Sequence, residues 1–224
     1  MDRQLTQLII IIITISCLLF SFGSYEVLNL PNNARSLALN NTTSAYDGNF
    51  LHNNPASISL RSGGMSYSYL YLPANIYLGE IHHVSKNNNG VKATKICLLN
   101  YGEFIDSETD EKYYAFDALV EMGYKRELKN IASVGISGGY LFSSVTGFNS
   151  QLLFSKIGVR SRLFRKRLGI GFSLENMGIL LKSYTDVKEP IPVLFRTAFY
   201  YKPMYISLII NGDMVKILDD NSFY

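Results

Sequence analysis

Tryptophan is absent from this sequence, cysteine occurs only twice and proline only six times. Cys17 lies in the N-terminal apolar run, which leaves Cys97 without a partner and excludes a disulfide-stapled scaffold. The formal net charge of +3 is too small to indicate nucleic-acid binding. Against these low counts stand 16 tyrosines, 13 phenylalanines and 17 glycines, a composition that favours β structure.

Long apolar runs are also missing beyond the first 20 residues. The single run, Leu8–Phe20, follows the charged Arg3 and precedes Ser21-Phe22-Gly23. For cleavage after Gly23, this tripeptide has small residues at the −3 and −1 positions. This order is typical of a secretory signal peptide. The run is shorter than the roughly 20 residues that a membrane-spanning helix needs. We therefore expect residues 1–23 to be a cleaved signal peptide and the protein to be exported.

The rest of the chain divides by composition. Residues 24–62 are rich in Asn, Ser and Ala and predict a short helical or irregular N-terminal segment. Residues 63–224 alternate between apolar and small or polar side chains with a period of two, which is the pattern of β-strands. The expected strands are 65–72, 76–84, 91–100, 113–124, 131–142, 151–159, 168–176, 193–201 and 205–213.

Nine alternating segments of this length fit two architectures. An antiparallel transmembrane β-barrel would turn the apolar face to lipid, whereas a soluble β-sandwich would turn it to a core. The signal peptide and the alternation together favour the barrel, with residues 24–62 at or in its mouth. In 168–176, for example, Leu168, Ile170, Phe172 and Leu174 are expected to face lipid. The charges on the opposite faces are the candidate lumen charges: Asp117, Glu121, Glu175, Asp213 and, on a less regular strand, Arg196.

The connections between strands differ in charge and length. Connections at one end sum to +9, and those at the other end sum to −4 and are the longest. Transmembrane barrels have short periplasmic turns and long outer loops, so the basic end is predicted to be periplasmic. The strongest candidate there is a basic periplasmic turn that contains Arg160, Arg162, Arg165, Lys166 and Arg167.

Catalytic and metal-binding motifs are weak. Gly135–Gly139 matches G-x-S-x-G, but no helix signal follows and all three histidines lie upstream, against the order of a nucleophile elbow. His82 and His83 are neighbours in a predicted strand and point to opposite faces, so they cannot chelate one ion as a pair. We expect no enzyme activity, no metal and no cofactor.

Three stretches resemble the PorV/PorQ family, PorQ-like members most closely. The first is Tyr25–Leu39, with its Leu-x-x-Pro-x-x-Ala-Arg-Ser-x-Ala-Leu pattern, followed by Asn54-Pro55-Ala56. The second is Ser173–Gly178 with Leu181–Tyr184, and the third is Glu189–Pro192 with Arg196. Asn40 and Asn41 stand where the family has glycines. The positions that match family motifs are Pro31, Ala34, Arg35, Ser36, Asn54, Pro55, Ala56, Asn176, Gly178 and Pro192.

The resemblance implies an outer-membrane barrel related to the long-chain fatty-acid transporters, and an accessory role in type IX protein secretion. The implied partners are outer-membrane lipid, other secretion proteins and secreted cargo. Two alternatives remain open: an outer-membrane transporter of hydrophobic small molecules, and a periplasmic β-sandwich binding module. The nine strands also predict an incomplete barrel, because bacterial single-chain barrels have an even number. The last strand is expected to end near Asp213, with a turn at Asp219-Asp220 leading towards another.

Overall fold

The computed structural model describes residues 25–31, 33–39, 41–42, 44–45, 51, 53–59, 64–87, 89–105, 110–128 and 131–218. The predicted signal peptide and the predicted turn at Asp219-Asp220 lie outside these residues, as does His52. Within them, no helix is long and apolar enough to cross a membrane.

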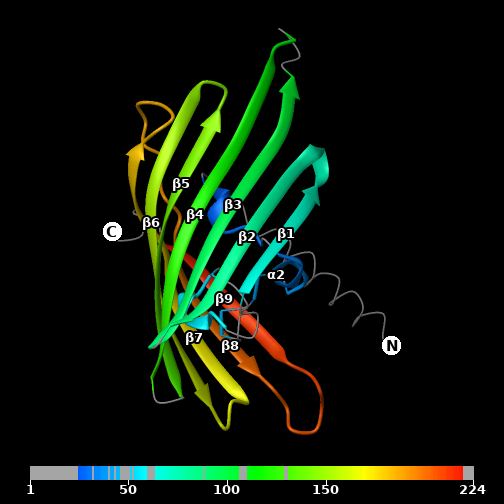
Figure 1. Cartoon of the computed structure of the whole chain (residues 1–224), viewed down its shortest axis with the longest axis vertical. Helices are drawn as coiled ribbons and strands as arrows, with labels where there is room; N and C mark the ends of the chain where they lie inside the picture. The colour runs from blue at the N-terminus through cyan, green and yellow to red at the C-terminus, as the bar shows by residue number, and fades with distance from the viewer. Residues whose placement is uncertain are drawn as a thin grey trace, which may run out of the picture.

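Nine strands form one antiparallel sheet in strictly sequential order (Figure 1). Their bounds are β1 Gly64–Leu72, β2 Ile76–Asn87, β3 Gly90–Ile105, β4 Lys112–Leu128, β5 Ala132–Val145, β6 Phe148–Leu163, β7 Leu168–Lys182, β8 Val193–Tyr201 and β9 Ile210–Leu218. The all-β class and the nine strands are confirmed. There is one curved, barrel-like sheet rather than the two packed sheets of a sandwich. It is not closed, since β1 and β9 do not pair with each other in the described structure.

Four short helical elements accompany the sheet in the described residues. These are η1 Glu26–Leu28, α2 Ala34–Ala38 and η2 Pro55–Ser57 before the sheet, and η4 Pro73–Asn75 between β1 and β2. The blue N-terminal segment lies inside the curve of the sheet in Figure 1. We call the described residues between Tyr25 and Ser59 the N-terminal plug.

The last strand differs from its prediction. Segment 205–213 was expected to be a strand ending near Asp213, but β9 begins at Ile210 and continues to Leu218. Its register with β8 explains the shift, because Tyr201 pairs with Ile210 and Val193 with Leu218 along the whole length of β8. The apolar alternation of Ile206 and Leu208 therefore belongs to the β8–β9 connection, where both side chains are exposed.

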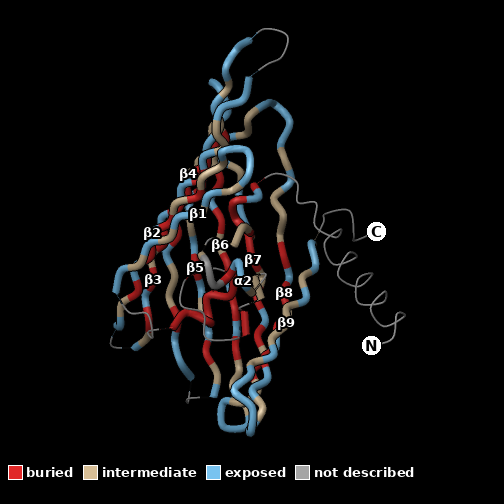
Figure 2. Tube along the Cα trace, turned by 90° about the vertical axis from the view of Figure 1, so that its right-hand side faces the viewer, coloured by how far each residue is buried: buried red, intermediate tan, exposed pale blue. Residues whose placement is uncertain are grey.

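The two faces of the sheet differ in burial. In β7, Gly169, Gly171, Ser173 and Glu175 are buried on the concave side, whereas Leu168, Ile170, Phe172 and Leu174 are on the other side and half-buried or exposed. This is the alternation predicted from the sequence. We call the concave side the inner face and the convex side the outer face. Buried residues concentrate midway along the strands, and exposed residues lie towards both ends (Figure 2).

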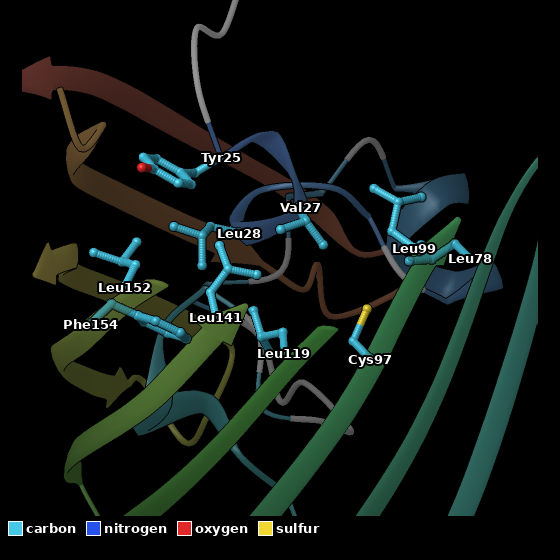
Figure 3. Close-up of a cluster of buried hydrophobic side chains, with 10 residues drawn as sticks. All are labelled: Tyr25, Val27, Leu28, Leu78, Cys97, Leu99, Leu119, Leu141, Leu152 and Phe154. Carbon is cyan, nitrogen blue, oxygen red and sulfur yellow. The ribbon is translucent and has the colours of Figure 1, made fainter. Parts of the chain in front are cut away.

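Apolar contacts attach the start of the plug to the inner face. Val27 and Leu28 of η1, with Tyr25 before them, are buried in a cluster built mainly from leucines of five strands (Figure 3). The strand residues of this cluster are Leu78, Cys97, Leu99, Leu119, Leu141, Leu152 and Phe154. Fully burying a leucine-sized side chain contributes about 1.5–3 kcal/mol, so this cluster is a large part of what holds the plug in place.

Candidate functional site

The plugged inner face is the candidate functional site, and Asn54 is at its centre. The Asn54 amide donates to the carbonyl oxygens of Ser44, Val159 and Phe172, at 3.1, 3.2 and 3.3 Å. Its side-chain oxygen accepts from the backbone NH of Ala56 at 2.9 Å and so caps η2. One fully buried side chain therefore ties the plug to itself and to the backbones of β6 and β7.

Glycines on the inner face make room for this close approach. A β-carbon at Gly135 would lie 2.3 Å from the Pro55 carbonyl carbon, and one at Gly158 would lie 2.1 Å from Asn54 Oδ1. A β-carbon at Gly171 would lie 2.8 Å from the Ser44 carbonyl oxygen. Because such distances are too short for real contacts, these three positions require glycine while the plug is docked. Two further bonds fix η2: Ser133 Oγ to Ala56 O at 2.9 Å and Lys125 Nζ to Ile58 O at 2.7 Å.

Replacing Gly135 with alanine is expected to loosen the plug. The new methyl group would meet plug backbone, which cannot rotate away, and overpacking of this kind typically costs about 1–3 kcal/mol. Hydrogen–deuterium exchange of residues 53–59 should become faster than in the unaltered protein. Gly138→Ala, in the same strand, is the matched control because its β-carbon would have an ordinary contact of 3.6 Å. Equal protection of residues 53–59 in both variants would contradict the docking role of Gly135.

A three-residue ion cluster lies on the inner face of β3, β4 and β6. Glu121 Oε2 is 3.0 Å from Lys95 Nζ and 3.3 Å from Lys156 Nζ. Ser137 donates to the other carboxylate oxygen of Glu121 at 2.7 Å. All three charged side chains are almost completely buried, so each depends on the others for the interactions that water would otherwise provide.

A second ion cluster connects β7, β8 and β9 to the plug. Arg196 donates to both carboxylate oxygens of Glu175, at 2.9 and 3.2 Å, and its Nη1 lies 3.6 Å from Asp213 Oδ2. Ser173 also donates to Glu175, at 2.6 Å. The backbone NH of Ser44, in the plug, donates to Asp213 at 3.3 Å. This cluster therefore stabilises both the sheet and the docked plug.

Hydroxyl groups near the cluster of leucines form one bond between the plug and the sheet and two bonds within the sheet. Tyr25 and Ser150 share a hydrogen bond of 2.9 Å, and Tyr101 donates to Asp117 at 2.8 Å, with Ser143 also bonded to Asp117. Burial raises the pKa of the Tyr25 phenol above its ordinary value, so it stays protonated and able to donate at neutral pH. In the connection between β7 and β8, burial raises the pKa of Tyr184 to about 12.

The structure brings together the charges that the sequence singled out. Asp117, Glu121, Glu175, Arg196 and Asp213 all lie on the inner face with buried side chains. Glu175, Arg196 and Asp213 form one cluster, Glu121 belongs to another, and Asp117 is in neither. With their charges neutralised by ion pairs or hydrogen bonds, these side chains are arranged to hold the interior together.

Half of the ten family-motif positions lie where the plug meets the sheet. Pro55 and Ala56 are buried in η2, beside the three bonds of Asn54. Asn176, in a left-handed conformation with φ of 60°, donates to Asn29 Oδ1 at 2.9 Å and to the Pro192 carbonyl at 3.1 Å. Ser36 instead bonds within the plug, to the backbone and side chain of Asn33 at the start of α2.

The remaining motif positions are less informative. Pro31 follows η1 and is half-buried, and a β-carbon at Gly178 would lie 2.6 Å from the Leu153 carbonyl oxygen. Ala34 and Arg35 begin α2, but their side chains lie outside the described part of the chain, so the expectation for them stays a prediction.

The predicted basic periplasmic turn is smaller than expected. Arg160 and Arg162 belong to β6, where Arg160 is buried on the inner face and Arg162 Nη2 lies 3.0 Å from Glu127 Oε1. The strand continues because Leu163 still pairs with Leu168. Only Arg165, Lys166 and Arg167 are in the turn, which with Phe164 spans residues 164–167. We call these four residues the basic turn.

Several inner-face residues were missed by the sequence reasoning. Lys95 and Lys156 lie in strands whose alternation was irregular, and the irregularity came from these charges at otherwise apolar positions. The spacing of Glu80 and His82, two residues apart in a predicted strand, was a usable signal; the two side chains are buried and in contact. His83 is on the outer face, so the two histidines do point apart.

The serine of the motif considered for catalysis makes a structural contact. Ser137 lies in the middle of β5 rather than at a strand-to-helix turn, and it donates to Glu121. In the residues that the structure describes, no group of three or more His, Cys, Asp or Glu side chains is arranged to hold a metal ion.

Comparison with known proteins adds no relative. No family model matches the sequence, and neither a curated protein nor a solved structure is significantly similar to it. The resemblance to the PorV/PorQ family therefore stays a prediction from the motifs, and the function is argued from the site itself.

Proposed function

We propose that this chain is an outer-membrane protein of the β-barrel type whose plug fills its interior, and that it serves type IX protein secretion as a non-enzymatic accessory. The accessory role covers the delivery or attachment of cargo at the cell surface. Its support is the resemblance of the plug and of the β7–β8 region to the PorV/PorQ family, together with the filled inner face.

The difference between the two faces of the sheet supports the proposed membrane location. The outer face exposes large apolar side chains along the middle of successive strands, such as Ile96, Val120 and Ile136. The inner face instead buries two ion clusters. This inversion of the usual soluble pattern is what a lipid-facing sheet requires, and contiguous exposed apolar surface of this extent is rare on soluble monomers.

The plug favours an accessory role over transport. A conduit for hydrophobic molecules needs an apolar cavity inside the sheet, whereas Asn54, Pro55 and the η1 residues occupy the inner face and bond to it. A groove of about 370 Å³ does open in this sheet, but its side-chain walls stand on the outer face of β5 to β8. The contacts made by the family-motif positions therefore hold the plug in place and do not line a passage.

The proposal has one structural requirement. Unpaired backbone groups are not tolerated in the hydrocarbon of a bilayer, so in a membrane the edges that β1 and β9 form in the described structure must be paired. The orientation we propose places the basic turn in the periplasm and the connections after β3 and β7 outside. This follows the rule that short turns are periplasmic and long loops are outside.

Deleting the gene in the bacterium that carries it distinguishes an accessory role in secretion from a role in the transport of hydrophobic molecules. We expect proteins normally released or displayed at the surface to accumulate in the periplasm, with uptake of a radiolabelled long-chain fatty acid unchanged. Proteomics of the surface, the medium and the periplasm measures the first, and filtration of labelled cells measures the second. Normal surface proteins with impaired fatty-acid uptake would instead support the transport alternative.

A further inference from the structure

The groove on the outer face is built from apolar side chains of four adjacent strands. Its walls are Val134, Ile157, Val159, Phe172, Leu174 and Phe195, and the backbones of Gly135 and Gly158 form its floor. Both glycines occupy inner-face positions, where a β-carbon would meet the plug, so only their backbone faces the groove, between the outward side chains of their neighbours. The groove also lies where the register of β6 with β7 shifts, between Ser155 and Ile157, and such irregularities bend and twist a sheet locally.

The basic turn connects β6 and β7, two of the four strands that line the groove. Its distance from the groove matches the length of a lipid acyl chain. Phe172 and Leu168 are four residues apart in β7, which at about 3.3 Å per residue is roughly 13 Å. One leaflet of a bilayer has a hydrocarbon layer of about 15 Å, half of roughly 30 Å. A headgroup at the basic turn would therefore place the end of its acyl chain in the groove.

The basic turn is held in position and carries the complementary charge. The Tyr200 hydroxyl donates to the Lys166 carbonyl oxygen at 3.2 Å, and the Lys202 backbone NH donates to the Arg167 carbonyl oxygen at 2.7 Å. The side chains of Arg165 and Lys166 are exposed, as is the ring of Phe164. Exposed basic groups near a membrane surface attract anionic headgroups, and aromatic residues flank the apolar band of transmembrane barrels at both interfaces.

We propose that the groove and the basic turn together form a binding site for one anionic glycerophospholipid, with its phosphate at Arg165 and Lys166 and an acyl chain between β5 and β8. This inference rests on the proposed membrane location, but it adds a specific lipid site to it. The site belongs to the periplasmic leaflet in the orientation given above.

Native mass spectrometry of the full chain, purified in detergent, tests the charge part of the site. With equal phosphatidylglycerol and phosphatidylcholine of identical chains, we expect one phosphatidylglycerol to be retained preferentially. The double variant Arg165→Gln/Lys166→Gln should lose this preference by roughly tenfold or more. Lys182→Gln/Lys188→Gln removes two exposed charges from the opposite end of the sheet and should keep it. Equal retention of both lipids by the unaltered protein would overturn the proposal.

The groove is tested separately by filling it from outside. Val159→Trp should reduce retention of both lipids, whereas Ile136→Trp, at an outward position that does not line the groove, should not. Because a tryptophan variant can fail to fold, a phosphatidylglycerol with a diazirine at the end of its acyl chain gives a second measurement on the unaltered protein. Crosslinks should concentrate on residues 157–159 and 172–174. Crosslinks spread evenly over the outer face would contradict the site, while leaving an outer-membrane location intact.

Discussion

Changing Glu121 to glutamine is expected to destabilise the folded protein by about 3–5 kcal/mol, the typical effect of removing one partner from a buried ion pair. The neutral side chain would leave Lys95 and Lys156 facing each other without the carboxylate that both contact, at 3.0 and 3.3 Å. Glutamine keeps the size of glutamate, so the loss would reflect charge rather than a cavity. The free energy of unfolding in urea, measured on protein folded in lipid vesicles, gives the result.

Two further variants show whether the effect belongs to the buried cluster. Glu103→Gln removes an exposed carboxylate that pairs with Lys112 at 2.7 Å, and it should leave stability nearly unchanged. The triple variant Lys95→Met/Glu121→Leu/Lys156→Met replaces the whole cluster by apolar side chains, and it should recover most of the lost stability. If Glu121→Gln were as stable as the unaltered protein, the buried cluster would have no structural role.

Placing an arginine on the outer face at mid-strand is expected to cost about 2–4 kcal/mol in a lipid bilayer. Val120, in the middle of β4, is the suitable site because it is 41% exposed and thus has room for a larger side chain. In water the same exposure would make Val120→Arg nearly neutral, within about 0.5 kcal/mol. The size of the effect therefore distinguishes lipid from water as the environment of the outer face.

Val187→Arg is the matched control for this measurement. It is the same substitution at a residue that is 73% exposed in the connection between β7 and β8, outside the strands. Folding yields and unfolding free energies in vesicles should be unaffected there. Ser173, at an inward position of β7, would be a poor control, because it is buried and donates to Glu175 at 2.6 Å.

The sequence predicted the sheet because the period of two is a strong and local signal. The nine strands followed from the alternation, and the facing of β7 followed from the alternation together with the predicted signal peptide. Strand ends were predicted less well, since they depend on which residues pair. Arg160 and Arg162 have the composition of a turn but extend β6 because Leu163 pairs with Leu168, and Ile206 and Leu208 have the alternation of a strand but lie in a connection.

The interior was only partly predictable. Inward charges such as Glu121 and Glu175 were found from their place in the alternation, but their partners were not, because pairing Lys156 with Glu121 depends on the register of three strands. The contacts between the plug and the sheet were even harder to predict from the sequence. Asn54 and Gly158 are 104 positions apart in the sequence, and only the folded sheet brings them together.

The central claim, that the protein resides in the outer membrane, is tested most directly by fractionating cells and following the full chain on gels. The account predicts recovery with outer-membrane fractions after osmotic shock and density separation, and a band whose mobility changes when the sample is heated before electrophoresis. Recovery in the soluble periplasmic fraction, with one mobility before and after heating, would contradict it.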